Sequence, residues 1–403
     1  MLAAASKGTG GGGDMRILHT SDWHVGKVLK GRDRHDEQAA VLASIARTAR
    51  DEDVDVVLIA GDLFETAAPS PTAQGLVMRT LLALRDDGRQ VVAIAGNHDS
   101  QHLLDAVYRP VLGQLGLHML GTPKRPDGGG TLRLRTRGGE DLVVAALPYL
   151  SHRYAVRAAE VLLHEAAEHT LDYARRVAQI IGLLTAGFTG DEVGVVMAHV
   201  TLLGGRRGGG EREPASALDY ELPASMLPAS AHYAALGHLH RQQEIPAACP
   251  AFYSGSPLAI DFGEQDNESA VLVVTAAPGI RADVRPVPVT GGRRLRTLRG
   301  TLDEVIAAGE QAGDAYLRVV LAEPARAGLG DLVRDKLPNV LEVQLDEQFR
   351  PGPGGQAGSR PSRAGRSPQQ LFGDYLAEQK KAGDQRIAAM FAELLDEVTA
   401  QPD

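Results

Sequence analysis

The chain is poor in cysteine and in aromatic residues. Its 403 residues include a single cysteine, Cys249, which excludes an internal disulfide framework and fits a protein that folds in a reducing cytoplasm. Phe, Trp and Tyr together make up 4% of the chain. A hydrophobic core therefore has to be built mainly from Val, Leu, Ile and Ala.

Long apolar runs and an excess of positive charge are also missing. No run reaches the roughly 18 apolar residues of a transmembrane helix, so we expect no membrane span. The formal net charge is -9, which argues against a uniformly basic surface but allows a local basic groove. Residues 1–14 are glycine-rich and lack the apolar core of a secretory signal, so we expect a disordered N-terminal tail there.

Apolar, strand-like runs alternate with helical patterns from residue 16 onward. Strands predicted at 16–20, 54–60 and 91–95 are separated by helices predicted at 35–50 and 69–84. This order predicts a βαβαβ unit with a largely parallel sheet. Right-handed crossovers then bring the carboxyl ends of the strands to one edge, where open α/β sheets bind ligands.

The rest of the chain divides into further predicted segments. Strands at 131–135, 141–147, 193–199, 252–257 and 270–275, with a long helix at 156–181, extend a first domain over residues 15–278. A small α/β module is predicted over 279–349, with strands at 281–289, 316–321 and 341–345 and helices at 302–312 and 329–336. Residues 350–366 have the Pro-, Gly-, Ser- and Arg-rich composition of a flexible linker, and 367–403 carry two short amphipathic helical stripes.

Metal-ligand residue types stand at the ends of five strand-like runs. In chain order they are Asp22 and His24, Asp62, Asn97 and His98, His199, and His238 with His240. A lone histidine at a strand end is usually a hydrogen-bonded structural residue, but five such clusters predict a dinuclear metal site. Carboxylate, amide and imidazole donors suit Mn²⁺, Fe or Zn and differ from an all-oxygen Ca²⁺ cage.

A pair of ions about 3.5–4 Å apart needs a bridging carboxylate and capping ligands on each side. Asp62, on the second strand and hence central, is the predicted bridge. The predicted ligands are Asp22, His24 and His240 for one ion and Asn97, His199 and His238 for the other. Such a pair clamps a phosphodiester and neutralises developing charge. His98, beside a ligand, is the predicted general acid for the leaving oxygen.

The motifs around these residues resemble a known superfamily. Gly61-Asp62, residues 96–99 (GNHD) and residues 237–240 (GHLH) are similar to the calcineurin-like metallophosphoesterase signature. Residues 18–27 (LHTSDWHVGK) and 253–257 (YSGSP) resemble one branch, the SbcD nuclease subunits, relatives of the meiotic-recombination double-strand-break nuclease. The similarity spans roughly residues 15–275 and continues more weakly to residues 367–372 (SPQQLF).

This resemblance implies a metallophosphoesterase β-sandwich flanked by helices, a small α/β capping domain that contacts DNA, and C-terminal helices that dock on a partner. The implied activity is that of a DNA exonuclease on double-stranded ends and an endonuclease on hairpins. It also implies two Mn²⁺ ions, with Mg²⁺, Fe or Zn as alternatives, and no nucleotide bound by this chain itself. The implied partner is an SbcC-type coiled-coil ATPase, in a heterotetramer around a homodimer located at the nucleoid. Glu65 departs from many relatives, which have Asp or His there.

Several readings stay open on the sequence alone. Arg206, Arg207 and Arg212 lie in a Gly/Arg-rich loop and are either phosphate contacts or part of a solvated loop. The helices near 76–84 and 102–112 suit either a dimer interface or the internal core. A phosphoesterase acting on small phosphodiesters or phosphoproteins would use the same metal ligands, but it would not need the cap and tail. A non-catalytic assembly protein is disfavoured by the complete ligand set.

Overall fold

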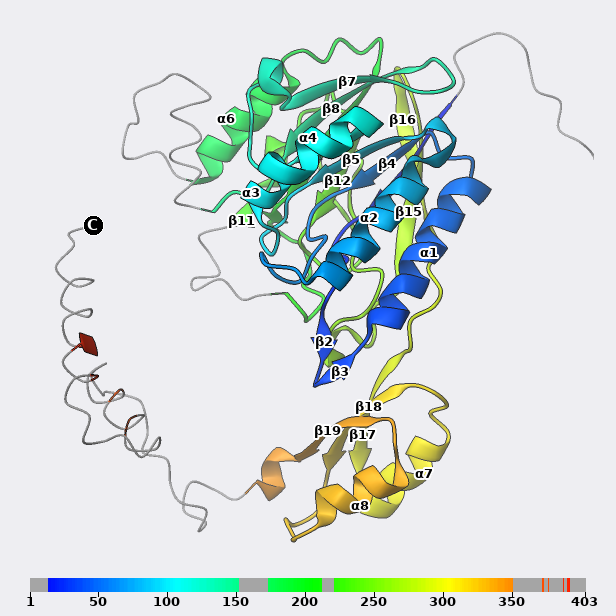
Figure 1. Cartoon of the computed structure of the whole chain (residues 1–403), viewed down its shortest axis with the longest axis vertical. Coiled ribbons are helices and arrows are strands. Elements are labelled where there is room, and N and C mark those ends of the chain that lie inside the picture. Colours follow the sequence, from blue (N-terminus) through cyan, green and yellow to red (C-terminus); the bar gives the residue numbers. More distant parts are fainter. Residues whose placement is uncertain are drawn as a thin grey trace, which may run out of the picture. The chain divides into compact units, whose positions relative to one another are not determined.

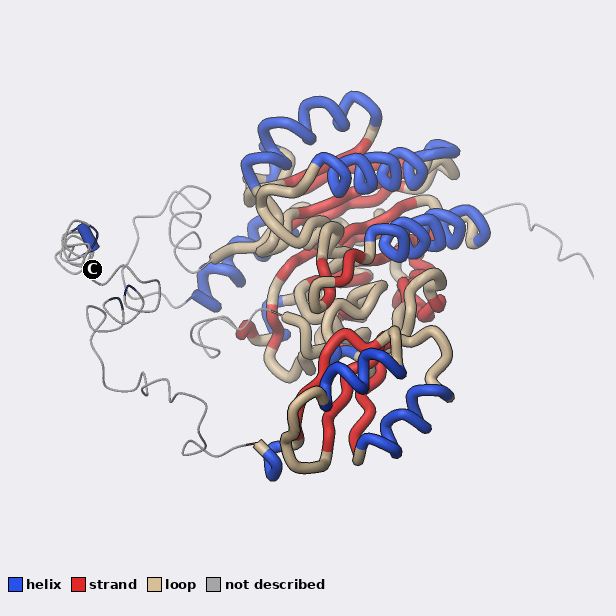
Figure 2. The backbone as a smooth tube through the Cα atoms, turned by 60° about the horizontal axis from the view of Figure 1, so that its bottom comes forward, coloured by secondary structure: helices blue, strands red, loops and turns tan. Residues whose placement is uncertain are grey.

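The computed structural model describes residues 14–151, 173–211 and 221–350, with five single positions in the C-terminal segment. Within these residues, two six-stranded sheets pack face to face and helices cover their outer faces (Figures 1 and 2). None of the helices in the described ranges is long and apolar enough to cross a membrane. The chain forms two compact units, 1–348 and 349–403, and the sheets belong to the first.

The first sheet has the order β16-β15-β1-β4-β5-β6. Its parallel strands are β1 (Met15–Thr20), β4 (Val56–Ile59), β5 (Gln90–Ile94) and β6 (Leu117–Leu120), and β15 (Ala270–Ala277) pairs antiparallel with β1. Helices α1 (His35–Asp51) and α2 (Pro71–Arg85) are the crossovers and pack on its outer face. The predicted βαβαβ unit is confirmed. Helix α2 starts close to where expected because the Ser70 hydroxyl accepts a hydrogen bond from the Ala73 N–H, and Pro71 has no N–H that would need an acceptor.

The second sheet has the order β13-β14-β12-β9-β8-β7. Its strands are β7 (Thr131–Arg135), β8 (Asp141–Leu147), β9 (Val193–His199), β12 (Tyr233–Gly237), β13 (Gln243–Ile245) and β14 (Ala251–Tyr253). Helix α6 (Tyr173–Thr185) covers its outer face. Of the helix predicted over 156–181, residues 156–172 lie outside the described ranges, and the described part is helical.

An aliphatic core joins the two sheets. Ile17, Leu58 and Val195 lie in it and are fully buried, whereas Leu18 and Val57, one residue along, pack under the helices. Because successive strand residues point to opposite faces, a strand buried on both sides reads as a continuous apolar run. The predicted sandwich flanked by helices is confirmed.

The strand predicted to open the small module belongs to the sandwich instead. Strand β16 (Ile280–Pro288) pairs antiparallel with β15, from Ala270 opposite Pro288 to Thr275 opposite Asp283. Gly279, at φ 72°, allows the tight turn that folds the chain back. Strand β16 is the exposed edge of the sheet, and the charged residues Arg281, Asp283 and Arg285 alternate along it with less polar ones. The change of composition at residue 278 therefore marks a sheet edge, and the predicted domain boundary there is wrong for this strand.

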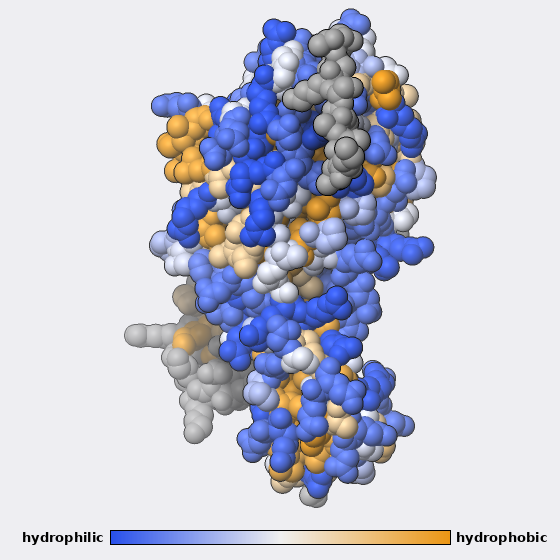
Figure 3. Space-filling view, turned by 90° about the vertical axis from the view of Figure 1, so that its right-hand side faces the viewer, coloured by the Kyte–Doolittle hydropathy of each residue, from blue (hydrophilic) through white to orange (hydrophobic). Residues whose placement is uncertain are grey.

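The small module starts at β17 (Leu295–Gly300), which pairs with β18 (Tyr316–Leu321), and β18 pairs with β19 (Val340–Leu345), all in parallel. Helices α7 (Leu302–Glu310) and α8 (Leu329–Lys336) cover one face of this sheet (Figure 1). Leu317 and Val319 pack under the helices, whereas Tyr316 and Arg318 point the other way and contact sandwich residues. On the face drawn in Figure 3, hydrophilic side chains predominate and hydrophobic ones form small separate patches.

Candidate metal centre

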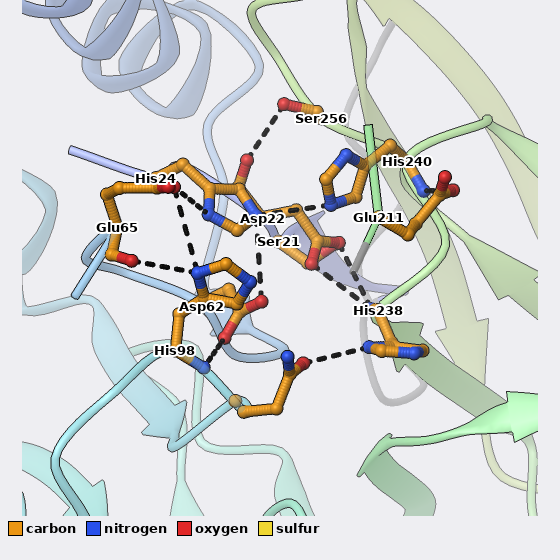
Figure 4. Close-up of polar contacts among 12 residues, drawn as sticks. Ser21, Asp22, His24, Asp62, Glu65, His98, Glu211, His238, His240 and Ser256 are labelled. Carbon is orange, nitrogen blue, oxygen red and sulfur yellow. Dashed lines mark hydrogen bonds and ion pairs between the residues drawn. The ribbon is translucent and has the colours of Figure 1, made fainter. Parts of the chain in front are cut away.

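The predicted ligands come from both sheets. Loops after β1, β4 and β5 carry Asp22, His24, Asp62, Asn97 and His98, while β9 and the loop after β12 carry His199, His238 and His240. From the sequence we expected all of them at the carboxyl edge of one parallel sheet; this is wrong for His199, His238 and His240, which belong to the second sheet. The carboxyl edges of two stacked sheets meet, and the side chains converge between them (Figure 4).

Four of the seven predicted ligands have a left-handed backbone. Asp22, His24 and Asp62 have φ between 46° and 54°, and His238 has φ 104°. Such conformations are costly for residues with a side chain and persist where the surrounding structure enforces them, which is often at functional sites. Gly61, at φ 101°, allows the loop after β4 to approach His199 closely, because a side chain at position 61 would collide with the His199 ring.

The first ligand group is Asp22, His24 and His240, which lie close enough together to share a metal ion. The Nε2 atoms of His24 and His240 are 3.1 Å apart. The other nitrogen of each ring faces a carboxylate: His24 Nδ1 is 3.1 Å from Glu65 Oε2, and His240 Nδ1 is 2.6 Å from Glu264 Oε1. A proton donated from Nδ1 leaves Nε2 as the ligand atom, the usual arrangement of metal-binding histidines.

The second ligand group is Asn97, His199 and His238. The Asn97 Oδ1 atom lies 3.0 Å from His199 Nε2 and 2.9 Å from His238 Nδ1. The His199 Nδ1 atom is 2.8 Å from the carbonyl oxygen of Ala60, which therefore fixes its tautomer. The ring of Tyr149 lies beside both histidines, with centroid distances of 6.1 and 6.4 Å.

Asp62 lies between the two groups. Its Oδ2 atom is 3.5 Å from His24 Nε2 and 3.6 Å from His199 Nε2. Its Oδ1 atom accepts a hydrogen bond of 2.8 Å from the His98 N–H. One carboxylate oxygen thus faces both ligand groups, as a bridging ligand would.

His98 lies at the rim of the first group. Its Nδ1 atom is 2.8 Å from the Glu65 carbonyl oxygen, and its ring is 4.6 Å from that of His24, edge to face. Its side chain also comes within metal-sharing distance of His24 and Asp62. The position suits either a proton donor beside the ions or an additional ligand.

Burial sets the charge state of these groups. It raises the pKa of Asp22 to about 6 and that of Asp62 well above its ordinary value, and it lowers the pKa of His24 and His199 to about 3. Neutral imidazoles are ready to bind a metal, and buried carboxylates need a cation nearby. Burial also disfavours charge on His240, but the hydrogen bond and charge of Glu264 outweigh it and raise its pKa to about 9. The donor set fits divalent ions.

Three carboxylates that support the site were not found from the sequence. Asp99 accepts hydrogen bonds from the N–H groups of Leu63, Phe64 and Gly96, joining the loops after β4 and β5. Its position directly after His98 in the GNHD motif was a usable signal. Glu264 and Glu211 lie 24 and 29 residues from His240 and carried no local signal.

The Gly/Arg-rich loop is held against the site rather than free. Glu211 accepts hydrogen bonds from the N–H groups of Gly208, Gly209 and His240. The Arg206 backbone exchanges two hydrogen bonds, of 2.8 and 2.7 Å, with the side chain of Gln243. The side chains of Arg206 and Arg207 are exposed, and Arg212 lies outside the described residues.

The sandwich and its paired ligand groups define a metal-dependent phosphoesterase, and family comparison agrees. The family model for calcineurin-like phosphoesterases matches residues 15–242. A second model, described as the type 5 capsule protein repressor C-terminal domain, matches residues 292–380. Its start agrees with the start of the small module at Leu295.

Three curated relatives share one name, that of the SbcD component of the nuclease SbcCD. The protein of Bacillus subtilis (strain 168) is 39% identical over 291 residues, or 70% of this chain and 71% of that protein. That of Rhodobacter capsulatus is 34% identical, over 73% and 75% of the two chains. That of Escherichia coli (strain K12) is 30% identical, over 74% of each. The chain belongs to the SbcD family of calcineurin-like phosphoesterases.

Proposed function

We propose that this chain is the Mn²⁺-dependent nuclease component of an SbcCD-type complex, cutting double-stranded DNA ends and DNA hairpins. The observation that carries the proposal is the position of Asp62 Oδ2, about equally far from His24 and His199. This arrangement supports a dinuclear centre in which one carboxylate serves both ions. The mixed nitrogen and oxygen donors suit Mn²⁺ better than Mg²⁺ or Ca²⁺.

Asp22, His24 and His240 would hold one ion and Asn97, His199 and His238 the other, with Asp62 between them. Bound ions supply positive charge to the phosphodiester and make a water molecule more acidic. The chain itself aims the ligand atoms: Glu65, Glu264 and the Ala60 carbonyl accept from the outer ring nitrogens. His98 would protonate the leaving oxygen from Nε2, because its Nδ1 is engaged by the Glu65 carbonyl.

The deciding experiment is a Mn²⁺-dependent assay on linear double-stranded DNA and on a DNA hairpin, with the SbcC-type partner present and absent. Cleavage that disappears in the Asp62→Asn variant supports the proposal. Hydrolysis of a cyclic mononucleotide without any DNA cleavage would support the alternative, a phosphoesterase for small substrates.

We propose a separate role for each of the predicted domains. The sandwich would be the nuclease domain and the module from Leu295 the DNA-contacting cap. Residues 367–403 would dock on the SbcC-type ATPase, and the stacking of Phe372 on Phe391, with centroids 3.9 Å apart, joins the two predicted apolar stripes. Deletion of 367–403 should abolish co-purification with the ATPase and preserve Mn²⁺-dependent cleavage. Continued co-purification would place the docking site elsewhere.

A homodimer is supported by an exposed apolar stripe. The helical segment from α3 (Gln101–Leu103) through η3 (Gly113–Leu115) exposes Val107, Val111 and Leu115 by 50, 61 and 49%. A spacing of four residues puts them on one helix face. The Val111→Asp variant should run as a monomer in sedimentation, and Leu332→Asp, on the exposed face of α8, should not change the assembly. A dimeric Val111→Asp protein would contradict this interface.

Arg206, Arg207 and Arg212 would contact phosphates next to the metal centre, consistent with an assembly acting at the nucleoid. Each lost phosphate contact lowers the slope of log affinity against log salt by about 0.9. Replacing all three by Ala should therefore flatten the slope for binding to duplex DNA. An unchanged slope would mean that the loop is merely solvated.

A further inference from the structure

The short 3₁₀ turn η6 (Phe262–Glu264) joins three parts of the molecule. Each of its residues contacts a different partner: the ligand His240, the Gly/Arg-rich loop, and the small module. No local sequence motif marks it, and the proposed reaction does not assign it a role.

Glu264 holds the ring of His240. Its Oε1 atom is 2.6 Å from His240 Nδ1, and its Oε2 atom accepts a hydrogen bond of 2.7 Å from the Ile260 N–H. The residue is 1% exposed. Both carboxylate oxygens are engaged in a buried setting, so the carboxylate cannot turn without losing one of these bonds.

Gly263 packs directly on the loop that carries Arg206 and Arg207. A side chain on Gly209 would come within 2.8 Å of the Gly263 backbone, and a side chain on Gly210 would collide with the carboxylate of Glu264. The loop and η6 therefore pack backbone to backbone at these glycines.

Phe262 connects η6 to the small module. It is 1% exposed and packs in a cluster with Leu29, Leu295 and Tyr316, the last two from the module. The guanidinium carbon of Arg318, on β18, lies 5.0 Å from the centroid of its ring. Alternation along β18 aims Arg318 at η6, on the face opposite the module's helices.

We propose that η6 is a positioning element: Glu264 orients His240 for metal binding, and Phe262 makes this orientation depend on the contact with the small module. The proposal rests on the proposed function, in that His240 is taken as a metal ligand. A change at the module contact would then alter the metal affinity of the first ligand group and not that of the second.

The test is calorimetric titration of the metal-free full-length protein with Mn²⁺. Glu264→Gln keeps the shape but places an amide N–H₂ where an acceptor is needed, so one binding step should weaken by about 10- to 100-fold while the other stays unchanged. Arg318→Ala should weaken the same step by about two- to fivefold, the equivalent of a cation–π contact. Glu268→Gln and Arg334→Ala, both exposed, are the matched controls.

A weaker affinity in a single binding step indicates a positioning role. A general structural defect would weaken both steps together. Two unchanged steps in Glu264→Gln, or equal weakening of both, would overturn the role of Glu264. An unchanged titration for Arg318→Ala would overturn the link to the module. A wild-type protein that binds two Mn²⁺ but does not cut DNA would refute the nuclease function and leave this inference standing. A wild-type protein that binds no Mn²⁺ would refute both.

Discussion

The two ligand groups are supported in different ways. In the first group, His24 and His240 are oriented by the side chains of Glu65 and Glu264. In the second, His199 is oriented by a backbone carbonyl, and both histidines contact the neutral Asn97. A carboxylate partner is removed by a single substitution, whereas a backbone partner is lost only if the strand moves. Substitution of a supporting side chain should therefore change the metal affinity of the first group, whereas the geometry of the second group should be harder to disturb.

Asp62→Asn should have the largest effect, because it removes the oxygen that both groups face. We expect Mn²⁺ affinity to fall by more than the roughly 100-fold limit typical of outer-shell changes, with loss of cleavage. Burial already disfavours the charge on Asp62, so the metal-free variant should be at least as stable as the wild type at pH 7. Calorimetry and thermal unfolding measure the two quantities. A variant that loses one site only would show that Asp62 is not shared.

His98→Ala should reduce the cleavage rate by about 100- to 10,000-fold, the usual contribution of a general acid, with both ions still bound. Single-turnover cleavage gives the rate and calorimetry the metal content. If instead one ion is lost, His98 is a ligand of the first group, and the assignment of three residues to each group is wrong.

Glu65→Gln tests the difference between the groups most directly. The carboxylate also pairs with Lys27, at 2.9 Å, and these contacts hold the pKa of Glu65 low, at about 2, against the opposing effect of burial. We expect one Mn²⁺ binding step to weaken by about 10- to 100-fold. Tyr149→Phe, which keeps the ring beside the second group, should leave both steps unchanged. Equal weakening of both steps by Glu65→Gln would mean that the two groups respond as one unit.

The smallest expected effect lies at Glu37 on α1, beside the segment that leads into the small module. Burial raises the pKa of Glu37, but hydrogen bonds from Arg34 and from the Arg293 N–H outweigh it and hold the pKa below the usual 4.5. A lowered carboxyl pKa stabilises the fold above pH 4.5, and this stabilisation is lost as the pH falls below that value.

Glu37→Gln should therefore lower the free energy of unfolding by about 1.5 kcal/mol at pH 7. The difference from wild type should shrink below pH 4.5, and Mn²⁺ affinity should stay the same. Denaturant unfolding at pH 7 and pH 3.5 measures this. A difference that does not change with pH would show that the loss is one of packing and not of charge.

Much of this molecule could be read from local pattern. The runs that became β1, β4, β5 and β9 end at predicted ligands because each motif couples an apolar strand to the residues directly after it. The length and order of helices α1 and α2 followed from helical periodicity. The failures were non-local. Whether an edge strand such as β16 joins the sandwich or the module depends on its pairing partner, which composition does not encode.

By itself, the sequence determined which residues are available as ligands, in what order they occur, and that each stands at a strand end. Only the tertiary structure decided that the edges of two sheets meet, so that Asp62 lies between His24 and His199. It also decided that Glu264 and Glu211 support His240 from 24 and 29 residues away. The physical reason is that hydrophobic periodicity specifies local conformation and burial, whereas contacts between distant segments depend on how the whole core packs.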